Sequence, residues 1–511
     1  MNFDFDKFLN LFLYSRENPM IFNSGFFIFL FFVFLLIYIK LRNSNNIRII
    51  YLVLFSCYFY YKSSGMYFLI MLSVTLWDFF IARRMYVENR RFVRKLLVIM
   101  SVAANLGLLA YFKYTNFFYE IFCNLTGRNF LSFDIFLPVG ISFFVFQSMS
   151  YTIDVYRRQL QPLDRIEDYA FFISFFPMLV AGPIIRARDF IPQIRKPLFV
   201  SCEMFGKGVF LIMSGLFKKA VISDYISVNF VDRIFDSPEL YSGVENLFGL
   251  YGYALQIYCD FSGYSDMAIG IATLLGFNVL ANFRSPYQSA SITEFWRRWH
   301  ISLSSWLRDY LYISLGGNRR GKIRTYLNLV ITMLLGGLWH GPSLRFVCWG
   351  AMHGVALAVH KFISGIGIKF TKEGIVIDFL KNRKDAVQRA SGIPAKIKRI
   401  SGVFFTFHFV CFSWIFFRAE TFDIAISMIK QIFTFFHIEV FPQMVKGYAT
   451  VFIAMAVGYV LHFVPEKTEQ KAINIVTAAP LILKTAMLVA VILFIMQIKS
   501  SEILSFIYFQ F

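Results

Sequence analysis

The chain has 511 residues, 57% of them hydrophobic, and a mean hydropathy of +0.58. Soluble domains are about 45–50% apolar, so this composition excludes a soluble globular fold. The net charge of +20 would indicate nucleic-acid binding in a soluble protein, but here the basic residues fall in loops between apolar runs, as the positive-inside rule describes. We therefore expect contact with a lipid bilayer and not with nucleic acid.

Apolar runs follow one another along almost the whole chain. A membrane-spanning helix needs about 20 mainly apolar residues, and ten runs come close to this length: residues 20–39, 66–82, 96–112, 135–153, 206–222, 247–277, 346–359, 402–417, 447–464 and 481–498. Three shorter runs, 47–61, 169–185 and 326–339, are ambiguous. The sequence predicts an all-α, polytopic membrane bundle of ten to thirteen segments in a single domain, residues 1–511.

The first apolar run, residues 20–39, is expected to be an uncleaved anchor. Asp4 and Asp6 stand where a secretory signal would have basic residues, and Lys40 and Arg42 follow the run. This places the N-terminus outside and the next loop in the cytosol. The loop at residues 83–95 carries five Arg and one Lys against one Glu, which fits a cytosolic position.

Residues 169–185 do not read as a simple span. Basic residues flank both ends, and Pro177, Gly182 and Pro183 interrupt the run. Irregular backbone at membrane depth must be buried in protein or line a cavity. We expect a broken or re-entrant helix here.

Residues 281–325 form the most polar stretch in the middle of the chain. The stretch contains eight Arg and Lys residues but only two acidic residues, Glu294 and Asp309, and Trp and Tyr residues are interleaved among them. This pattern predicts amphipathic helices in the cytosolic interface, with aromatic rings at headgroup depth. A second basic stretch, residues 369–399, is expected to be a mobile cytosolic loop.

His340 is a candidate general base. It ends an apolar run and is surrounded by Gly336, Gly337, Gly341 and Pro342, whose backbone can bend or approach a ligand closely. An imidazole with a reference pKa near 6.5 can take a proton from a hydroxyl group and pass it on. The alternative is a packing or capping histidine at a kink.

His300 is a second candidate. On one continuous helix, Trp296, His300 and Ser304 would share a face. Asp309 would point away from His300 on that helix, so the spacing does not support a His–Asp dyad. The alternative is an ordinary interfacial residue.

Other polar residues in apolar runs have weaker signals. His353 and His360 share a helical face and could line a path, although a buried stripe satisfied by neighbouring helices is the simpler interpretation. Asp260 and Asp266 lie inside an apolar run, where a carboxylate faces a cavity or a partner. The alternative is a structural hydrogen-bond network between helices. No phosphate-binding Gly-rich loop, GxSxG elbow or paired cysteine spacing is present, and we predict no metal site.

Seven short stretches together resemble the membrane-bound O-acyltransferase family. They are residues 137–143, 150–157, 181–184, 258–270, 295–320, 336–341 and 414–418. Their order along residues 137–418 is similar to the bacterial branch that contains alginate O-acetyltransferase and the D-alanyl-lipoteichoic-acid transferase. Residues 1–128 are not matched and are treated as variable N-terminal helices.

The resemblance implies a ring of helices around a tunnel through the bilayer. His340 would be the family's catalytic histidine and His300 its second site histidine, with Trp339, Asp260, Asp266 and His353 in the tunnel. Cytosolic acyl-CoA would be the donor, with acetyl as the default group and no permanently bound cofactor. Its phosphates would bind four arginines: Arg297, Arg298, Arg319 and Arg320.

The resemblance also implies an extracytoplasmic polysaccharide acceptor and a multi-pass location in the bacterial cytoplasmic membrane. An extracytoplasmic acyltransferase or a small membrane protein would be a partner. Two alternatives remain: acylation of a lipid or protein, and a non-enzymatic transporter. A transporter would explain the apolar runs and basic loops, but not Trp339-His340-Gly341 together with Trp299-His300.

Overall fold

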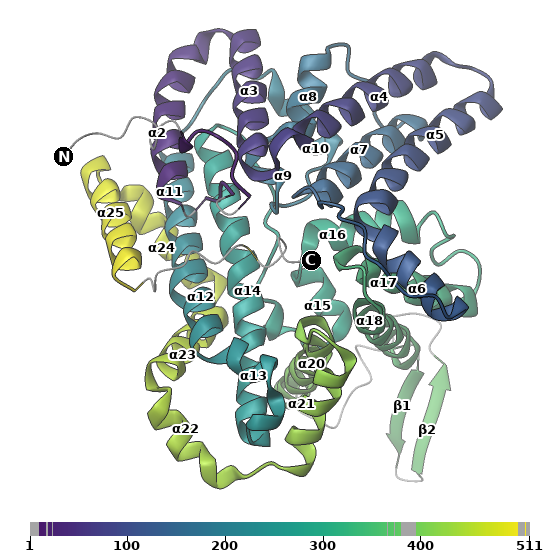
Figure 1. Ribbon diagram of the computed structural model, residues 1–511, viewed down its shortest axis with the longest axis vertical. Coiled ribbons are helices and arrows are strands. Elements are labelled where there is room, and N and C mark those ends of the chain that lie inside the picture. Colours follow the sequence, from purple (N-terminus) through teal and green to yellow (C-terminus); the bar gives the residue numbers. More distant parts are fainter. Residues whose placement is uncertain are drawn as a thin grey trace. The chain divides into compact units, whose positions relative to one another are not determined.

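A computed structural model describes residues 10–16, 19–22, 24–364, 366–371, 374–379, 395–498 and 506. These residues are predominantly helical, which confirms the predicted all-α class (Figure 1). They form two compact units. The first comprises Met1–Val221, Asp260–Ala281 and Pro465–Phe511, and the second comprises Ile222–Cys259 and Asn282–Val464. The single domain of residues 1–511 stays a prediction.

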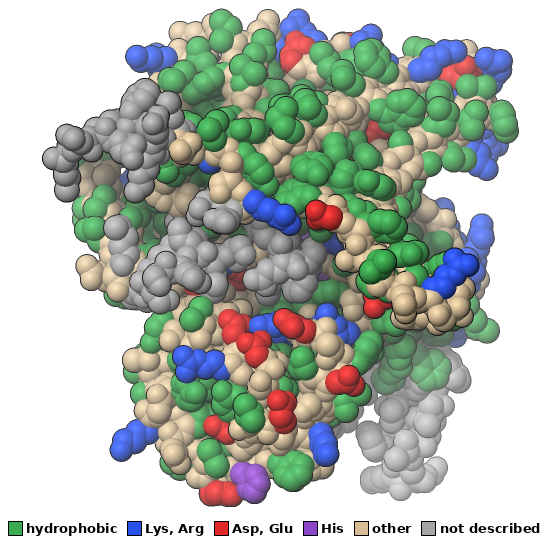
Figure 2. Space-filling model, viewed as in Figure 1, with side chains coloured by type: hydrophobic (Ala, Val, Ile, Leu, Met, Phe, Trp, Pro, Cys, Tyr) green, Lys and Arg blue, Asp and Glu red, His purple; other side chains and the backbone are tan. Residues whose placement is uncertain are grey.

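The first unit begins with long apolar helices: α2 (Gly25–Lys40), α3 (Asn45–Ser64), α4 (Phe68–Val87), α5 (Arg91–Leu109) and α6 (Thr115–Thr126). Ser24 starts α2 because its side chain accepts a hydrogen bond from the backbone N–H of Phe27. Large apolar side chains of α5, including Phe92, Leu96 and Ile99, are exposed. Figure 2 shows hydrophobic side chains across much of the visible surface. Such a surface suits lipid better than water.

The interior of the first unit contains α7 (Ile141–Tyr156), α8 (Ile166–Ser174), α9 (Phe176–Leu179) and α10 (Ala187–Ile194). Nearly every residue of α7 is buried. Helix α8 stops before Phe175, Pro177 lies in the first turn of the short α9, and no helix follows until α10. The broken helix predicted for residues 169–185 is therefore confirmed.

Close helix packing joins α11 (Cys202–Leu216) to the later part of α14 (Gly243–Leu274) within the first unit. A Cβ atom at Gly215 would lie 2.4 Å from the carbonyl oxygen of Gly263, and one at Gly270 would lie 2.7 Å from that of Gly208. These glycines let the two backbones approach closely, as small residues do between membrane helices. Helices α24 (Glu466–Ala478) and α25 (Leu481–Ile498) complete this unit and pack on α11.

The described residues of the second unit form the earlier part of α14 and the following further helices: α12 (Asp224–Ile226), α13 (Asp232–Asp236), α15 (Ile292–Arg298), α16 (Ile301–Trp306), α17 (Lys322–His340), α18 (Leu344–Ile363), α20 (Ala395–Arg418), α21 (Phe422–Thr434), α22 (Phe441–Gly447) and α23 (Ala449–Phe463). Short 3-10 or π-helical segments occur in both units: η1 (Leu41–Asn43), η2 (Gly65–Tyr67), η3 (Ala110–Tyr114), η4 (Phe217–Ser223), η5 (Ser227–Val231), η6 (Pro238–Leu240), η7 (Pro286–Gln288), η8 (Leu307–Tyr312) and η9 (Ile438–Val440).

Within the described residues, one short hairpin contains β-strands. Strand β1 (Ile366–Thr371) pairs with the antiparallel strand β2 (Gly374–Phe379), with Ile366 opposite Phe379. It lies across the start of the stretch at residues 369–399, where we expected a loop. Residues 372–373 and 380–394 of that stretch lie outside the described residues.

Fewer helices reach membrane-spanning length than the ten to thirteen segments we expected. Among the described residues, five continuous helical stretches are long and apolar enough to cross a bilayer, or up to seven if two bent helix pairs each count as one span. The five are Gly25–Asn43, Asn45–Val87, Arg91–Thr126, Leu344–Ile363 and Lys396–Arg418. Several other apolar runs form shorter helices, such as α7 with 16 residues and α11 with 15, so the number of membrane segments stays a prediction.

The stretch at residues 281–325 is not a set of surface helices. Its aromatic side chains Trp299, Trp306 and Tyr310 are buried. Trp299 packs on Trp414 of α20, with ring centres 5.1 Å apart. These rings therefore contact the core of the second unit, and their predicted depth in the membrane interface stays a prediction.

Candidate active site

Glycine packing between α17 and α18 fixes the position of His340. A Cβ atom at Gly337 would lie 2.1 Å from the carbonyl oxygen of Phe346, and one at Gly350 would lie 2.3 Å from that of Met333. Gly354, one helical turn beyond Gly350, is similarly close to the backbone of Val330. This Gly-x-x-x-Gly spacing is the sequence signature of closely packed membrane helices. The spacing is visible in the sequence, although the predictions above did not use it.

His340 is the last residue of α17 and is 3% exposed. Helix α17 stops there because Gly341 is extended and Pro342 follows, and Ser343 then caps α18 by accepting a hydrogen bond from the N–H of Arg345. The His340 ring contacts the rings of Trp349 and Phe417, with centres 5.2 and 5.3 Å away. The histidine predicted at a helix end is thus held among aromatic rings from α18 and α20.

His300 lies in a break between two helices, not on one continuous helix. Its backbone is left-handed, with φ 42° and ψ 56°, and it precedes α16 while α15 ends at Arg298. The shared helical face expected for Trp296, His300 and Ser304 is therefore wrong. A non-glycine residue in this conformation is uncommon and requires support from its surroundings. Here the carbonyl oxygen of Asn282 accepts a hydrogen bond from the N–H of Ile301.

The two predicted histidines lie side by side in the second unit. The ring centres of His300 and His340 are 6.5 Å apart, within the range of contacting aromatic pairs. Trp339 contacts both, with ring centres 6.1 Å from His300 and 5.0 Å from His340. The structure therefore brings together His300, Trp339 and His340 from positions forty residues apart in the chain.

His300 has a neutral polar environment. It is fully buried, its Nδ1 atom is 3.3 Å from Oδ1 of Asn282, and Oγ of Ser302 is 3.5 Å away. Burial lowers the pKa of His300 to about 3, so the imidazole is neutral at physiological pH. Asp309 pairs with Arg308 at 2.7 Å.

His353 has a structural environment. Its Nδ1 atom accepts a hydrogen bond from Nε1 of Trp296 at 3.3 Å, and its Nε2 atom lies 2.9 Å from Oγ of Ser413. Because Ser413 donates its own hydrogen to the carbonyl oxygen of Val410, Nε2 must be the donor in this contact. His353 thus links α15, α18 and α20, as the buried-stripe interpretation predicts. Its predicted place in a tunnel stays untested.

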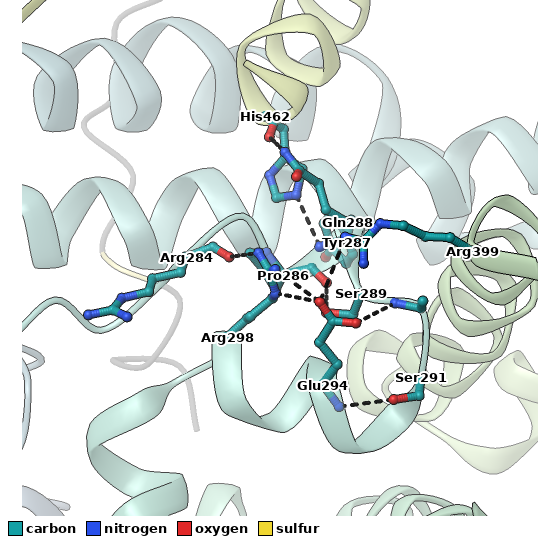
Figure 3. A network of polar contacts seen from close by, with 11 residues as sticks. Arg284, Pro286, Tyr287, Gln288, Ser289, Ser291, Glu294, Arg298, Arg399 and His462 are labelled. Atoms are coloured by element: carbon teal, nitrogen blue, oxygen red, sulfur yellow. Dashed lines mark hydrogen bonds and ion pairs between the residues drawn. The ribbon is translucent and has the colours of Figure 1, made fainter. Parts of the chain in front are cut away.

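A carboxylate-centred network fixes the segment that leads into His300 (Figure 3). One carboxylate oxygen of Glu294 accepts hydrogen bonds from Arg298 at 2.9–3.0 Å, and the other accepts from the N–H of Ala290. Ser291 caps α15 at the N–H of Glu294, and Arg298 also donates to the carbonyl oxygen of Arg284. The Ser-x-x-Glu capping signal was readable in the sequence. Arg298 therefore has a structural task, and its predicted phosphate contact is not supported by this geometry.

A cavity of about 730 Å³ lies in the second unit next to these elements. Its polar lining is basic and rich in hydroxyl groups, without a carboxylate among the described lining residues: Thr293, Trp296, Arg297, Ile301, Ser304, Ser305, Leu307, Arg308, Tyr312, Asn318, Leu329, Thr332, Met333, Leu357, His360, Lys361 and Ser364. Arg297 is the predicted arginine that lines it. Arg319 and Arg320 are exposed in the turn after Asn318 and do not.

Arg308, His360 and Lys361 also line the cavity, although none of them was predicted as a donor-site residue. They come from η8 and α18, so their proximity is set by tertiary packing. Lys361 and Tyr312 both donate to the side-chain oxygen of Asn318, and His360 contacts Thr293 at 2.8 Å. Neither His300 nor His340 is among the lining residues, so the tunnel stays a prediction.

Asp260 and Asp266 belong to the first unit, where each forms an ion pair with a lysine. Asp260 pairs with Lys219, and both side chains are buried, whereas Asp266 pairs with Lys218 at 2.7 Å. These contacts join η4 to α14 and match the structural alternative for both carboxylates. Their predicted place in a tunnel is untested.

Comparisons with known proteins agree with the sequence motifs. The model of the MBOAT, membrane-bound O-acyltransferase family, matches residues 109–371. The Probable alginate O-acetylase AlgI of Pseudomonas putida is 38% identical over 426 residues, or 81% of each chain. The Peptidoglycan O-acetyltransferase of Helicobacter pylori is 33% identical over 445 residues, 81% of this chain and 80% of its own. The Teichoic acid D-alanyltransferase of Bacillus subtilis is 27% identical over 300 residues, 56% of this chain and 69% of its own.

Both the extent of the family match and the identity to the alginate O-acetylase support one assignment. The matched region contains His300, Trp339, His340 and most of the basic cavity. The expected resemblance is thereby confirmed, and it sets the transporter alternative aside. The chain belongs to the membrane-bound O-acyltransferase family and is a membrane acyltransferase.

Proposed function

We propose that this acyltransferase moves an acyl group, by default acetyl, from cytosolic acyl-CoA to hydroxyl groups of an extracytoplasmic polysaccharide or cell-envelope polymer. Its location would be the bacterial cytoplasmic membrane. The observation that carries the proposal is the contact between His300 and His340 in the family region. The names alginate O-acetylase and peptidoglycan O-acetyltransferase among the relatives support a polymer hydroxyl as acceptor.

The proposed chemistry is a direct acyl transfer. His340 takes the proton of the acceptor hydroxyl while the hydroxyl oxygen attacks the thioester carbonyl carbon. The bond from that carbon to sulfur then breaks, sulfur leaves with the electron pair, and the proton passes from His340 to the sulfur. His300, neutral because of its burial, assists by hydrogen bonding within the same aromatic enclosure. The products are an ester and free CoA.

The basic cavity is the proposed donor site. Its volume falls within the range of small-molecule pockets. Arg297, Arg308 and Lys361 supply positive charge, and hydroxyl groups supply further hydrogen bonds for phosphate oxygens. Ile301, the residue after His300, lines it, as does Met333, about 10 Å before His340 along α17. The thioester end of a bound donor would then point toward the histidine pair.

The class of acceptor is identified from the labelled product. Peptidoglycan, an exopolysaccharide, a lipid and a protein differ in the labelled product that they yield. A second protein, either an extracytoplasmic acyltransferase or a small membrane protein, is proposed as a partner on the side of the membrane where the acceptor lies.

The test uses membranes that contain the full chain and acetyl-CoA with a radiolabelled acetyl group. We expect His340→Ala to lower both thioester cleavage and base-labile label in polymer by on the order of 10²–10⁴-fold. His437→Ala is the matched control, because His437 is exposed and pairs with the nearby Glu439 on the surface.

Equal activity of wild type and His340→Ala would overturn the proposal. Label that appears in lipid or protein while polymer stays unlabelled would overturn the polymer acceptor but leave the acyltransferase chemistry standing. Loss of activity in both histidine variants would mean that the assay reports protein integrity instead of catalysis, which thermal unfolding of each variant checks.

A further inference from the structure

Asn282 meets the turn that carries His300 through both its backbone and its side chain. It is buried, with 1% exposure. Its backbone oxygen accepts from the N–H of Ile301 at 2.9 Å. Its side-chain oxygen Oδ1 accepts from the N–H of Ser302 at 3.1 Å and from Oγ of Ser302 at 2.9 Å, and it lies 3.3 Å from Nδ1 of His300.

The orientation of the Asn282 amide follows from these contacts. A backbone N–H can only donate, so the amide atom opposite the N–H of Ser302 must be the oxygen. A flipped amide would place its NH₂ group against that N–H, with two donors facing each other. The atom near Nδ1 of His300 is therefore an acceptor.

The position of the proton on His300 follows in turn. If Nδ1 carried a lone pair, it would face Oδ1 of Asn282 at 3.3 Å and Oγ of Ser302 at 3.5 Å. The Ser302 hydrogen is already directed to Asn282 in the shorter contact of 2.9 Å. The lone pairs on Nδ1 and on Oδ1 of Asn282 would then repel each other. A proton on Nδ1 replaces this repulsion with a hydrogen bond from Nδ1 to Oδ1. A neutral imidazole then has its acceptor at Nε2.

We propose that Asn282 is a positioning residue that holds His300 in the Nδ1–H tautomer, so that Nε2 is the nitrogen that takes part in acyl transfer. The catalytic part of this inference rests on the proposed function. The same amide also stabilises the left-handed backbone at His300, which orients the ring against His340. The hydrogen-bonding partner in this arrangement is a neutral amide, so it fixes the tautomer without favouring the charged imidazolium.

The tautomer can be measured without an activity assay. The full chain has seven histidines, so a sample labelled with ¹⁵N at histidine gives few NMR signals, and the His300 signals are those lost in His300→Gln. We expect Nδ1 of His300 to be protonated in the wild type. In Asn282→Leu, which has a similar volume but no acceptor, the proton should redistribute toward Nε2. A wild-type Nε2–H tautomer, or an unchanged tautomer in Asn282→Leu, would overturn the assignment.

Kinetics provides the second readout. Asn282→Leu should lower kcat about 10- to 100-fold, the range seen when groups that orient functional imidazoles are lost. KM for acetyl-CoA should stay the same, because Asn282 does not line the cavity. Ser302→Ala, which keeps the amide next to Nδ1, is the matched control and should retain kcat within a few-fold. Equal decreases in kcat in Asn282→Leu and Ser302→Ala would mean that Asn282 only stabilises the turn.

Asn282→Asp separates positioning from folding, because a carboxylate keeps the acceptor oxygens. Its negative charge should raise the pKa of His300 from its low value. The neutral ring is the active form, so activity is lost as pH falls through this pKa, and the acid limb of kcat should move to higher pH. The titratable group that faces His300 from α17 is His340. Ser302, two residues further along the chain, is uncharged, and so are Asn282 and Phe283 from the preceding segment.

The same experiments distinguish the two claims. An acid limb that stays in place in Asn282→Asp would contradict the positioning role. An Nδ1–H tautomer combined with full activity of His300→Gln would contradict the participation of His300 in transfer, while activity lost only in His340→Ala would leave the proposed acyl transfer intact.

Discussion

His300 and His353 are both fully buried in the second unit, but their surroundings differ. Both ring nitrogens of His353 are used in a chain of hydrogen bonds that begins at Trp296 and ends at the carbonyl oxygen of Val410. His300 lies on a left-handed turn with its ring against His340. Burial alone therefore does not separate His300, the proposed catalytic histidine, from His353, which has a structural environment. The partners of each nitrogen and the conformation of the backbone do.

The largest expected difference between His300 and His353 is in the effect of their substitution on kcat. We expect His300→Gln to reduce kcat by on the order of 10²–10⁴-fold, because a proton-transferring or hydrogen-bonding imidazole is lost from the reacting groups. The thermal unfolding midpoint should change little. Steady-state assays with labelled acetyl-CoA measure kcat. Thermal unfolding of the detergent-solubilised protein measures the midpoint. A similar fall in kcat in His353→Gln would remove the distinction.

His353→Leu should show the opposite pattern. The substitution removes the acceptor of the partly buried Trp296 N–H and the donor to the Ser413 oxygen, while Ser413 keeps its hydrogen bond to Val410. An unsatisfied buried group costs about 1–3 kcal/mol. Stability should therefore fall, while kcat of the folded fraction stays within a few-fold of wild type. Denaturant titration in detergent, with activity normalised to folded protein, checks both. Unchanged stability would contradict the structural role.

Two adjacent arginines on α15 extend the same comparison. Arg297 lines the cavity, and Arg298 is held by Glu294 and Arg284. Arg297→Gln should raise KM for acetyl-CoA about 3- to 10-fold, the equivalent of up to about 1.4 kcal/mol, and Lys361→Gln should act in the same direction. Arg298→Gln should instead lower stability. If Arg298→Gln alone raised KM, the cavity would not be the donor site.

The smallest effect is expected in the turn after η8. Arg319 and Arg320 are exposed and do not line the cavity, so Arg319→Gln and Arg320→Gln should change KM less than twofold. The measurement is the same donor titration at low and physiological salt, because exposed charges act mainly through screened, long-range attraction. A larger rise in KM than that of Arg297→Gln would restore these two residues as phosphate ligands.

Local sequence signals predicted a good part of this architecture. Pro177 and the nearby Pro183 marked the broken helix, and Gly341 with Pro342 marked the end of α17 at His340. The motifs around His300 and His340 indicated the family from the sequence alone. The Ser291–Glu294 capping pair and the spacing of Gly350 and Gly354 were equally visible in the sequence and could have been used.

Other features depend on contacts between distant segments. No glycine or proline marks the helix break at His300, because Asn282, eighteen residues earlier, supports it. Lys361 and Arg308 line one cavity because α17 packs on both α18 and η8. The carboxylates Asp260 and Asp266 looked functional by their location, but their lysine partners lie more than forty residues away. Periodicity and composition cannot identify such partners.

The close glycine packing between α17 and α18 has a consequence for saturation mutagenesis. Any side chain larger than hydrogen at Gly337 or Gly350 would collide with backbone of the facing helix, and the helix end that bears His340 would shift. A functional screen of all substitutions would then rank these glycines as intolerant as the histidine itself, although they touch no reacting atom. Intolerance in such a screen would map the geometry that supports catalysis together with the residues that perform it.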